Sequence, residues 1–308
     1  MNKRTAVVGG SIVGAIALLG WFSIRESSSK PSTTSSTNAM PGMTVTDTTS
    51  DAAGHVMPGM SMGHSGALTE MKPLVAGANG TRASAAGLTL EPKHASFSPG
   101  QTAQWQLRVV NRMNMAVTKF ERDQTKLMHL IIVRSDLTDY QHVHPVLGRA
   151  GIFTIDLRLP RPGSYRAIAD FTTGGRRYAL GVSIQVPGAG KQASLPAESM
   201  HATTDGFSVE TTHGDPKAGS ETEVRFTIRR NGRPVTALVP YLGAYGHLVA
   251  LHKADLAYSH VHPTSEERSK GLISFVAEFP TRGAYRLFLQ FRTSSGVHTA
   301  PFTVKVSS

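Results

Sequence analysis

The sequence predicts an all-β protein with two tandem antiparallel β-sandwich domains, placed after an N-terminal transmembrane helix and a disordered tether. Three observations support this fold class. The chain has 308 residues, which is enough for two domains of about 100–150 residues each. A long block in the second part of the chain occurs twice. Both copies contain short alternating apolar and polar runs separated by Gly- and Pro-containing turns, which is typical of strands.

The first element is an uncharged apolar run of 19 residues, at positions 6–24. As a helix it would span roughly 28 Å, close to the thickness of the bilayer core. Lys3 and Arg4 precede it, which favours a cytoplasmic N-terminus. We therefore expect residues 1–24 to be a transmembrane anchor. A cleaved signal peptide is the alternative, although no A-x-A site follows the run.

Either form of this first element places the remaining chain outside the cytoplasm, as a single-pass membrane protein or as a secreted one. This location argues against nucleic acid as a partner, despite a formal net charge of +11. The predicted partners are instead a metal ion, the membrane through the N-terminal helix, and a protein of the cell envelope.

The second element, residues 25–85, has the composition of a disordered tether, with Ser- and Thr-rich runs and no apolar periodicity. A flexible coil of about 60 residues has an end-to-end distance of roughly 40–45 Å. The tether would therefore let the folded part reach across a periplasm-like space.

Methionine and histidine are concentrated in this tether. The tetrapeptide M-P-G-M occurs twice, and its second copy lies within H-V-M-P-G-M-S-M-G-H. Thioethers prefer Cu(I), and imidazole adds affinity for copper and zinc. The tract resembles the Met/His-rich segments of bacterial extracytoplasmic copper-handling proteins, which implies Cu(I) binding; the alternative is a linker without a ligand. The candidate ligands are Met40, Met43, His55, Met57, Met60, Met62 and His64.

The third element is the internal repeat. Residues 129–145 read HLIIVRSDLTDYQHVHP and residues 247–263 read HLVALHKADLAYSHVHP. A second shared motif, G-x-Y-R, follows at 163–166 and 283–286. We expect domain 1 at 86–187, a linker at 188–200 and domain 2 at 201–308. The strands expected in the first copy are 105–110, 130–133, 153–157, 166–171 and 183–186.

The duplicated H-x-H-P and G-x-Y-R motifs resemble those of secreted or membrane-anchored actinobacterial proteins with tandem immunoglobulin-like domains. Tyr165 and Tyr285 resemble the tyrosines that precede an apolar strand in such domains. Proteins of this kind are associated with heavy metals and copper. The resemblance therefore implies two immunoglobulin-like sandwiches and strengthens the expectation of a bound metal.

The repeated histidines are candidate metal ligands. In each H-x-H pair the two side chains of an extended segment point to the same face. A third histidine from a neighbouring strand would complete a three-nitrogen site suited to Cu(II) or Zn(II). Asp136 and Asp255 are close enough in sequence to orient a ligand. The candidate ligands are His129, His142 and His144 in the first copy, and His247, His260 and His262 in the second.

Further donors lie nearby in the sequence: Met113, Met115 and Met128 in the first copy, and His252 and His298 in the second. The alternative is that each H-x-H-P segment is a structural corner whose imidazoles bind backbone carbonyls. Duplication copies a structural corner as readily as it copies a metal site.

The absence of cysteine excludes disulfides, thiolate zinc sites, iron–sulfur clusters and Cys-ligated blue copper. No G-x-S-x-G, phosphate-binding loop or H-E-x-x-H motif indicates an enzyme. The sequence therefore predicts an extracytoplasmic copper-binding protein for metal sequestration, transfer or tolerance. The alternative is a membrane-anchored immunoglobulin-like interaction module whose histidines are structural.

Overall fold

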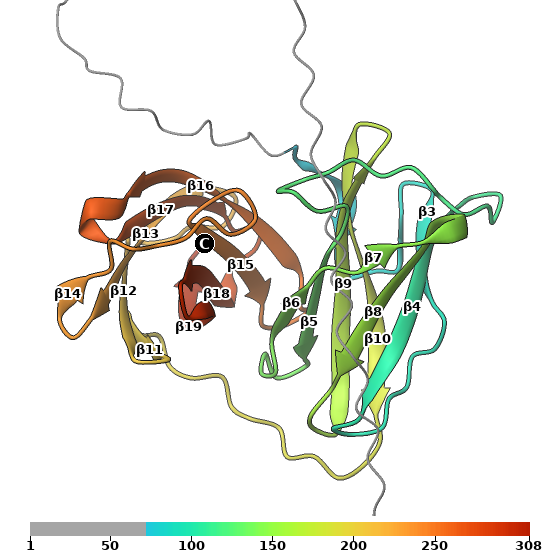
Figure 1. Cartoon of the computed structure of the whole chain (residues 1–308), viewed down its shortest axis with the longest axis horizontal. Coiled ribbons are helices and arrows are strands. Elements are labelled where there is room, and N and C mark those ends of the chain that lie inside the picture. The colour runs from blue at the N-terminus through green and yellow to red at the C-terminus, as the bar shows by residue number, and fades with distance from the viewer. Residues whose placement is uncertain (1–71) are drawn as a thin grey trace, which may run out of the picture. The chain divides into compact units, whose positions relative to one another are not determined.

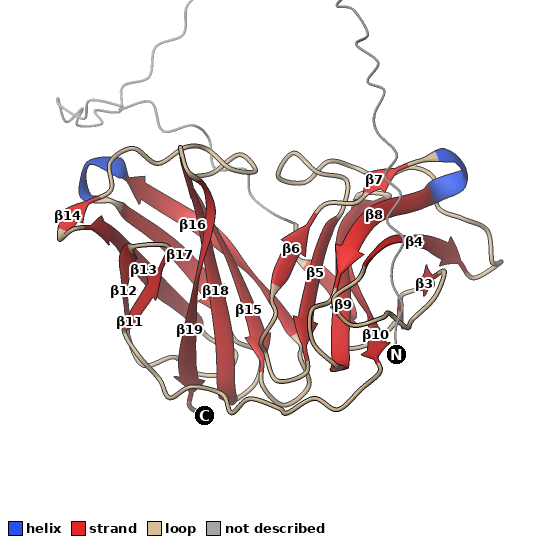
Figure 2. Ribbon diagram, turned by 60° about the horizontal axis from the view of Figure 1, so that its bottom comes forward, coloured by secondary structure: helices blue, strands red, loops and turns tan. Residues whose placement is uncertain are grey.

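The computed structural model describes residues 72–308, which are built of strands and two single-turn 3₁₀ helices (Figures 1 and 2). They belong to one compact unit, Ser61–Ser308. The predicted anchor, and the tether with its Met/His tract, precede residue 72 and lie outside the described residues. Within 72–308, no helix has the length and apolar character required to cross a membrane.

The first repeat consists of two five-stranded sheets, in the orders β1-β10-β9-β5-β6 and β2-β3-β4-β8-β7. Alternate residues of β4, among them Trp105 and Leu107, point into a core that both sheets share. The elements are β1 (Leu74–Asn79), β2 (Ser84–Ala85), β3 (Leu88–Pro92), β4 (Thr102–Asn111), β5 (His129–Arg134), β6 (Gln141–Val143), β7 (Val146–Leu147), η1 (Arg149–Gly151), β8 (Ile152–Arg158), β9 (Gly163–Thr173) and β10 (Arg176–Val186).

The second repeat forms one continuous path of strands, β11-β12-β13-β17-β16-β15-β18-β19, with β14 beside β13. Its core is rich in phenylalanine, including Phe226, Phe275 and Phe302. The elements are β11 (His201–Thr204), β12 (Phe207–His213), β13 (Glu221–Arg230), β14 (Arg233–Pro234), β15 (Gly246–His252), β16 (Tyr258–Glu267), η2 (Arg268–Lys270), β17 (Leu272–Glu278), β18 (Gly283–Thr293) and β19 (Gly296–Val306).

The two repeats differ at the H-x-H-P segment. In the first repeat, β6 pairs with β5 and β7 pairs with β8, and the chain leaves the ladder between them at Pro145. In the second repeat the same segment is one strand, β16, which pairs with β15 at its start and with β17 towards its end. The register of β16 shifts between Pro263 and Ser265, because proline has no N–H for the ladder.

The predicted all-β class with two repeated units is confirmed, and each of the five strands expected in the first repeat lies within or along an observed strand. The expected boundary of the tether at residue 85 is too late. Strand β1 runs parallel to β10, and the Gly80 N–H donates to the Ala179 carbonyl at 2.8 Å. The sequence LVAGAN reads as linker because it has small residues and little apolar alternation, yet it is paired with a central strand.

The repeated G-x-Y-R motif forms the same corner in both copies. The Tyr165 hydroxyl donates to the Arg161 carbonyl at 2.9 Å, and the Tyr285 hydroxyl donates to the Thr281 carbonyl at 3.0 Å. Each bond joins residues four positions apart and closes the turn that leads into a strand, β9 or β18. This motif is therefore structural, and the immunoglobulin-like assignment stays a prediction.

The two repeats also share a hydrophobic cluster. Ile131 and Val133 of β5 meet Val249 and Leu251 of β15 in it, and Phe288 of β18 joins them. These strands are buried along their whole length, because one face lies in the repeat's own core and the other in the shared cluster. The cluster brings the ends of β5 and β15, where two of the repeated histidines lie, towards each other.

Candidate metal centre

Three histidines of the first repeat converge at the start of β5. His129 is the first residue of β5, His142 lies in β6, and His144 follows β6 directly. Because Leu130 is paired with Val143, the next residues outward, His129 and His144, lie opposite each other. One ring nitrogen from each histidine lies within 4.8 Å of the others. We call these three residues the histidine triad.

Hydrogen bonds outside the triad determine which nitrogens carry protons. His129 Nε2 lies 3.0 Å from the Asp123 carbonyl, and His142 Nδ1 lies 2.8 Å from the Gln290 amide oxygen. An oxygen of this kind only accepts, so both of these nitrogens donate a proton. In the neutral rings the other nitrogens, His129 Nδ1 and His142 Nε2, are therefore without protons and point at each other.

The spacing of these nitrogens suits a metal ion. His129 Nδ1 lies 3.0 Å from His142 Nε2 and 3.2 Å from His144 Nε2. Ligand nitrogens at 2.0–2.1 Å from a tetrahedral ion are about 3.3 Å apart. Two facing lone pairs at 3.0 Å repel each other unless a proton or a cation lies between them. The two distances from His129 Nδ1 are thus close to the spacing of ligands in a four-coordinate site.

The surroundings keep the triad neutral. Burial, followed by the nearby His129 and Lys126, lowers the pKa of His144 to about 3. Burial lowers the pKa of His142 well below its usual range, and burial also lowers the pKa of His129. Metal binding requires unprotonated imidazole. At neutral pH the three rings therefore have their lone pairs available.

A network of charges supports the segment that holds His129. The buried Arg177 guanidinium lies 3.6 Å from the Asp123 carboxylate and forms an ion pair with Asp170. The Tyr258 hydroxyl of the second repeat donates to Asp170 at 2.7 Å. Asp170 in turn is paired with His129 across the β5–β9 ladder. This network fixes the position of the carbonyl that orients the His129 ring, as outer partners of metal ligands do.

Asp136 does not orient a histidine of the triad, so that expectation is wrong for the first repeat. Asp136 is paired with the buried Arg134 and accepts from the Ala193 N–H at 2.9 Å. Asp255 accepts from His252 Nδ1 at 2.8 Å. The orienting groups are instead a backbone carbonyl and Gln290, which is 148 residues away from His142 in the chain.

The other expected donors lie elsewhere. Met113 and Met115 are exposed on a turn, at 73% and 51%, and Met128 is fully buried in the core of the first repeat. In the second repeat, His252 contacts Asp255, while His298 donates to Asp205 at 2.8 Å and lies 2.9 Å from the Thr293 hydroxyl. None of these five residues joins the histidine triad.

The histidines of the second repeat have a different arrangement. His247 is buried in β15, at 5% exposure. His260 and His262 lie in β16, opposite Val249 and Val276 respectively, and their side chains lie outside what the structure describes. The tether candidates, from Met40 to His64, likewise precede the described residues.

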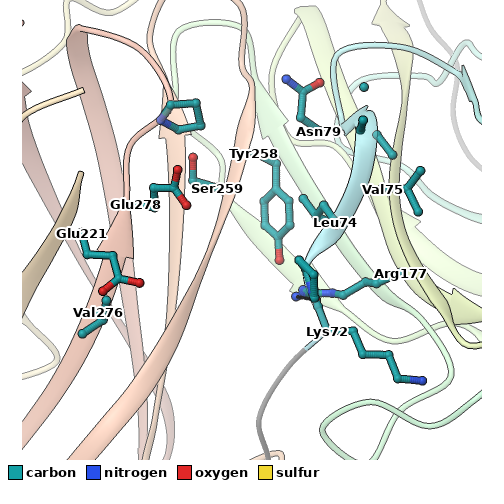
Figure 3. A pocket seen from close by; sticks show the side chains of 15 residues that line it. Lys72, Leu74, Val75, Asn79, Arg177, Glu221, Tyr258, Ser259, Val276 and Glu278 are labelled. Atoms are coloured by element: carbon teal, nitrogen blue, oxygen red, sulfur yellow. Dashed lines mark hydrogen bonds between the residues drawn. The ribbon is translucent and has the colours of Figure 1, made fainter. Parts of the chain in front are cut away.

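A separate pocket of about 420 Å³ lies beside β1 (Figure 3). Leu74 and Arg177 of the first repeat and Tyr258 and Glu221 of the second are among the residues that line it. Figure 3 shows the Tyr258 ring pointing towards the Arg177 side chain. No member of the histidine triad lines this pocket, so the pocket and the triad are two distinct features.

A family model described as a domain of unknown function (DUF8832) matches residues 83–188 and again residues 202–308. The two matched segments coincide with the two repeats of the structure. No curated protein matches the chain.

Among solved structures, the chain is similar to three proteins of Escherichia coli and Yersinia pseudotuberculosis. The adhesin FdeC of Escherichia coli is 12% identical, over 72% of this chain and 64% of that one, with a TM-score of 0.25. InvD of Yersinia pseudotuberculosis is 14% identical, over 71% and 57%, with a TM-score of 0.24. The Yersinia adhesin InvE is 12% identical, over 70% and 58%, with a TM-score of 0.23. The chain thus spans 57–64% of the length of these proteins, and TM-scores this low support no inference about function.

Proposed function

This chain belongs to the DUF8832 family, of whose domain it carries two copies, and we propose that it binds a divalent transition metal through its histidine triad. The observation that carries the proposal is the contact between His129 Nδ1 and His142 Nε2 at 3.0 Å. Both nitrogens lack protons in the neutral rings, because the opposite nitrogen of each ring donates to an oxygen atom. A cation bound to both nitrogens would replace the repulsion between their lone pairs with two coordinate bonds.

The metal that we propose is copper, as Cu(II), with Zn(II) as the competing ion. Imidazole ligands suit both ions, and among divalent ions of the first row Cu(II) binds such sites most tightly. The Met/His tract of the tether supports copper, because thioethers are soft ligands that prefer Cu(I). In this proposal the tether captures Cu(I) and the folded part holds Cu(II).

The proposed location is the outer side of a membrane, with the apolar run at 6–24 as the anchor and residues 25–71 as the tether. The role that fits such a protein is metal sequestration, transfer or tolerance. The alternative function is an interaction module for a protein or cell-wall partner, in which the histidines only stabilise the fold.

The proposal is tested with the chelator-treated full chain and with His129→Ala, titrated with Cu(II) and separately with Zn(II). We expect one ion per chain at the triad and a rise in melting temperature, since a ligand at 100 times its Kd adds about 2.7 kcal/mol to the free energy of unfolding. His129→Ala should lose this ion and the stabilisation. His201→Ala, an exposed histidine outside the triad, serves as the matched control.

The interaction module predicts a different result. In that case His129→Ala lowers the melting temperature by the same amount with metal and with chelator, and the wild-type chain shows no metal-dependent shift. Zn(II) is the more informative probe of the triad, because thioethers of the tether bind it poorly.

A further inference from the structure

His247 is a buried side chain of which one ring nitrogen, Nε2, has no hydrogen-bond partner within the described residues. It lies in β15 at the position that His129 occupies in β5, and it is 5% exposed. Its Nε2 atom is buried and makes no hydrogen bond within the described residues. An unpaired polar atom in such a place costs about 1–3 kcal/mol. The side chain is therefore expected to gain a partner in another state of the protein.

The His247 ring lies next to the histidine triad. Its centroid is 6.3 Å from that of His142, whereas the centroids within the triad are 4.8–5.2 Å apart. Gln290, whose amide oxygen accepts the hydrogen bond from His142 Nδ1–H, is paired with His247 across the β15–β18 ladder. The Tyr241 ring packs against His247 at 5.8 Å and against His144 at 6.5 Å. His247 thus borders the triad on the side of the second repeat.

His247 has the protonation state of a ligand. Burial and the neighbouring His129 lower its pKa to about 4, although the backbone of Tyr241 and Leu242 favours the charged ring. Because Nε2 makes no hydrogen bond in the described part of the chain, the bonds to the backbone of Tyr241 and Leu242 belong to Nδ1, which carries the proton of the neutral ring and leaves a lone pair on Nε2.

We infer that His247 is the fourth ligand of the metal held by His129, His142 and His144, so that one ion joins the first repeat to the second. The inference rests on the proposed metal-binding function and adds to it the identity of the last ligand. Three imidazoles from one repeat fill three corners of a tetrahedron, and the unpaired nitrogen of His247 fills the fourth. A small approach of the His247 ring, to the spacing found within the triad, completes the site.

A metal with four protein ligands is a closed, structural type of site, whereas three ligands leave a position for water or substrate. The ion would therefore stabilise the contact between the repeats and would leave no position open for catalysis. This agrees with the absence of catalytic motifs from the sequence.

The test uses the full chain with Zn(II) or Co(II) alone as the probe. The variants are His247→Gln, which keeps a polar side chain in the buried position, His129→Ala, and the exposed control His201→Ala. Zn(II) affinity is measured by calorimetry, and the ligand set by the visible spectrum of bound Co(II). Melting temperatures in chelator verify that each variant is folded.

We expect His247→Gln to bind one Zn(II) about tenfold or more weakly than the wild type, since even partners outside the ligand set change metal affinity 10- to 100-fold. Its Co(II) spectrum should change, and His201→Ala should match the wild type in both measurements. Zn(II) should also protect the linker at 187–200 from proteolysis in the wild type and not in His247→Gln.

Other outcomes separate the two claims. If His129→Ala abolishes binding while His247→Gln retains wild-type affinity and spectrum, the fourth-ligand inference is wrong and the triad site remains. If the wild-type chain binds neither ion, the proposed function fails, and the inference fails with it.

Discussion

Two hydrogen bonds prepare the histidine triad for a cation, and both involve atoms that carry no charge. The Asp123 carbonyl and the Gln290 amide oxygen each accept a hydrogen bond from one imidazole N–H. Each bond leaves the inward nitrogen of its ring bare, so the tautomers are set before any metal arrives. The arrangement depends on these acceptors as much as on the histidines themselves.

Replacing the side-chain acceptor tests this role. In Gln290→Ala, the His142 ring loses the partner of its Nδ1–H and is free to rotate or to change tautomer. We expect the affinity for Zn(II) to fall about 10- to 100-fold, as for other outer partners of metal ligands. The matched control is Gln185→Ala. The amide oxygen of Gln185 accepts a hydrogen bond from the exposed Ser164 hydroxyl at 2.9 Å, away from the triad. Equal affinities for both variants in a calorimetric titration would contradict the assignment.

The lowered pKa values predict how stability depends on pH without metal. The pKa values of the three triad histidines are lowered in the folded chain, so the unfolded chain takes up protons at a higher pH than the folded chain does. The stabilising contribution is therefore complete above about pH 6.5 and is lost as the pH falls below it; for His144 the loss extends towards its pKa of about 3.

Urea denaturation in chelator, from about pH 7.5 to about pH 4.5, should show a steady fall in the free energy of unfolding below pH 6.5. Saturating Zn(II) should delay the fall, because metal and protons compete for the same nitrogens. A stability that stays constant down to about pH 5 would be inconsistent with buried neutral histidines.

The sequence identified the triad but not the groups that orient it. The H-x-H spacing placed His142 and His144 on one face, and the neighbouring-strand argument supplied His129. Every residue has a backbone carbonyl, so the sequence does not show that the Asp123 carbonyl binds His129. Gln290 lies in the other repeat, far from the triad in the sequence. Asp136 is close to the triad in sequence, but it forms an ion pair with the buried Arg134, two residues away.

At the scale of elements, the pairing of β1 with β10 depends on Gly181 of β10. A Cβ atom at Gly181 would lie 1.8 Å from the Gly80 carbonyl oxygen, and the Gly181 N–H donates to the Arg82 carbonyl at 2.7 Å. Only a residue without a side chain lets the segment after β1 approach the strand this closely.

We therefore expect Gly181→Ala to displace the segment around Gly80 and to lower the free energy of unfolding by about 1–3 kcal/mol. Hydrogen exchange should become faster at the Gly80 amide, which donates to Ala179. Gly214→Ala is the control, since its Cβ would meet nothing within 4 Å; its effect should be within about 0.5 kcal/mol. Unchanged exchange at Gly80 would show that β1 does not depend on this contact.

Long alternating strands were predictable from the sequence, whereas short or weakly apolar ones were not. β4 and β8 have the apolar alternation of a half-buried strand, and β9 follows a Pro-Gly turn. β1 contains mainly small residues and pairs with β10, where Leu74 lies opposite Arg177. β2 has only two residues, Ser84 and Ala85, and pairs with the neighbouring β3. The assignment of β1 needs the tertiary contact, which no local pattern encodes, and β2 is too short for a pattern to be visible.

At the scale of the whole folded part, the shared hydrophobic cluster couples the repeats. The Tyr140 and Phe288 rings stack across it, with centroids 4.0 Å apart and planes inclined by 8°. Phe288 is 4% exposed, so most of its surface is covered by the cluster. Unfolding of one repeat would expose these side chains in the other.

Phe288→Ala should therefore cost about 3–5 kcal/mol and separate one calorimetric transition into two. Phe275→Ala, in the second repeat's own core, removes a similar side chain but leaves the shared cluster intact. For this control we expect a lower melting temperature with a single transition. If both variants unfold in one step, the repeats are coupled by more than this cluster.

Equivalent positions of the two copies fill the shared cluster: Ile131 and Val249, Val133 and Leu251, Ile168 and Phe288. A single copy of the domain would thus present the surface that a second copy covers, as in a homodimer. Because residues 187–200 join the copies, each meets the other at an effective concentration in the millimolar range. Pairing of the copies is then independent of how dilute the protein is, and a site built from both copies survives at a single molecule per cell.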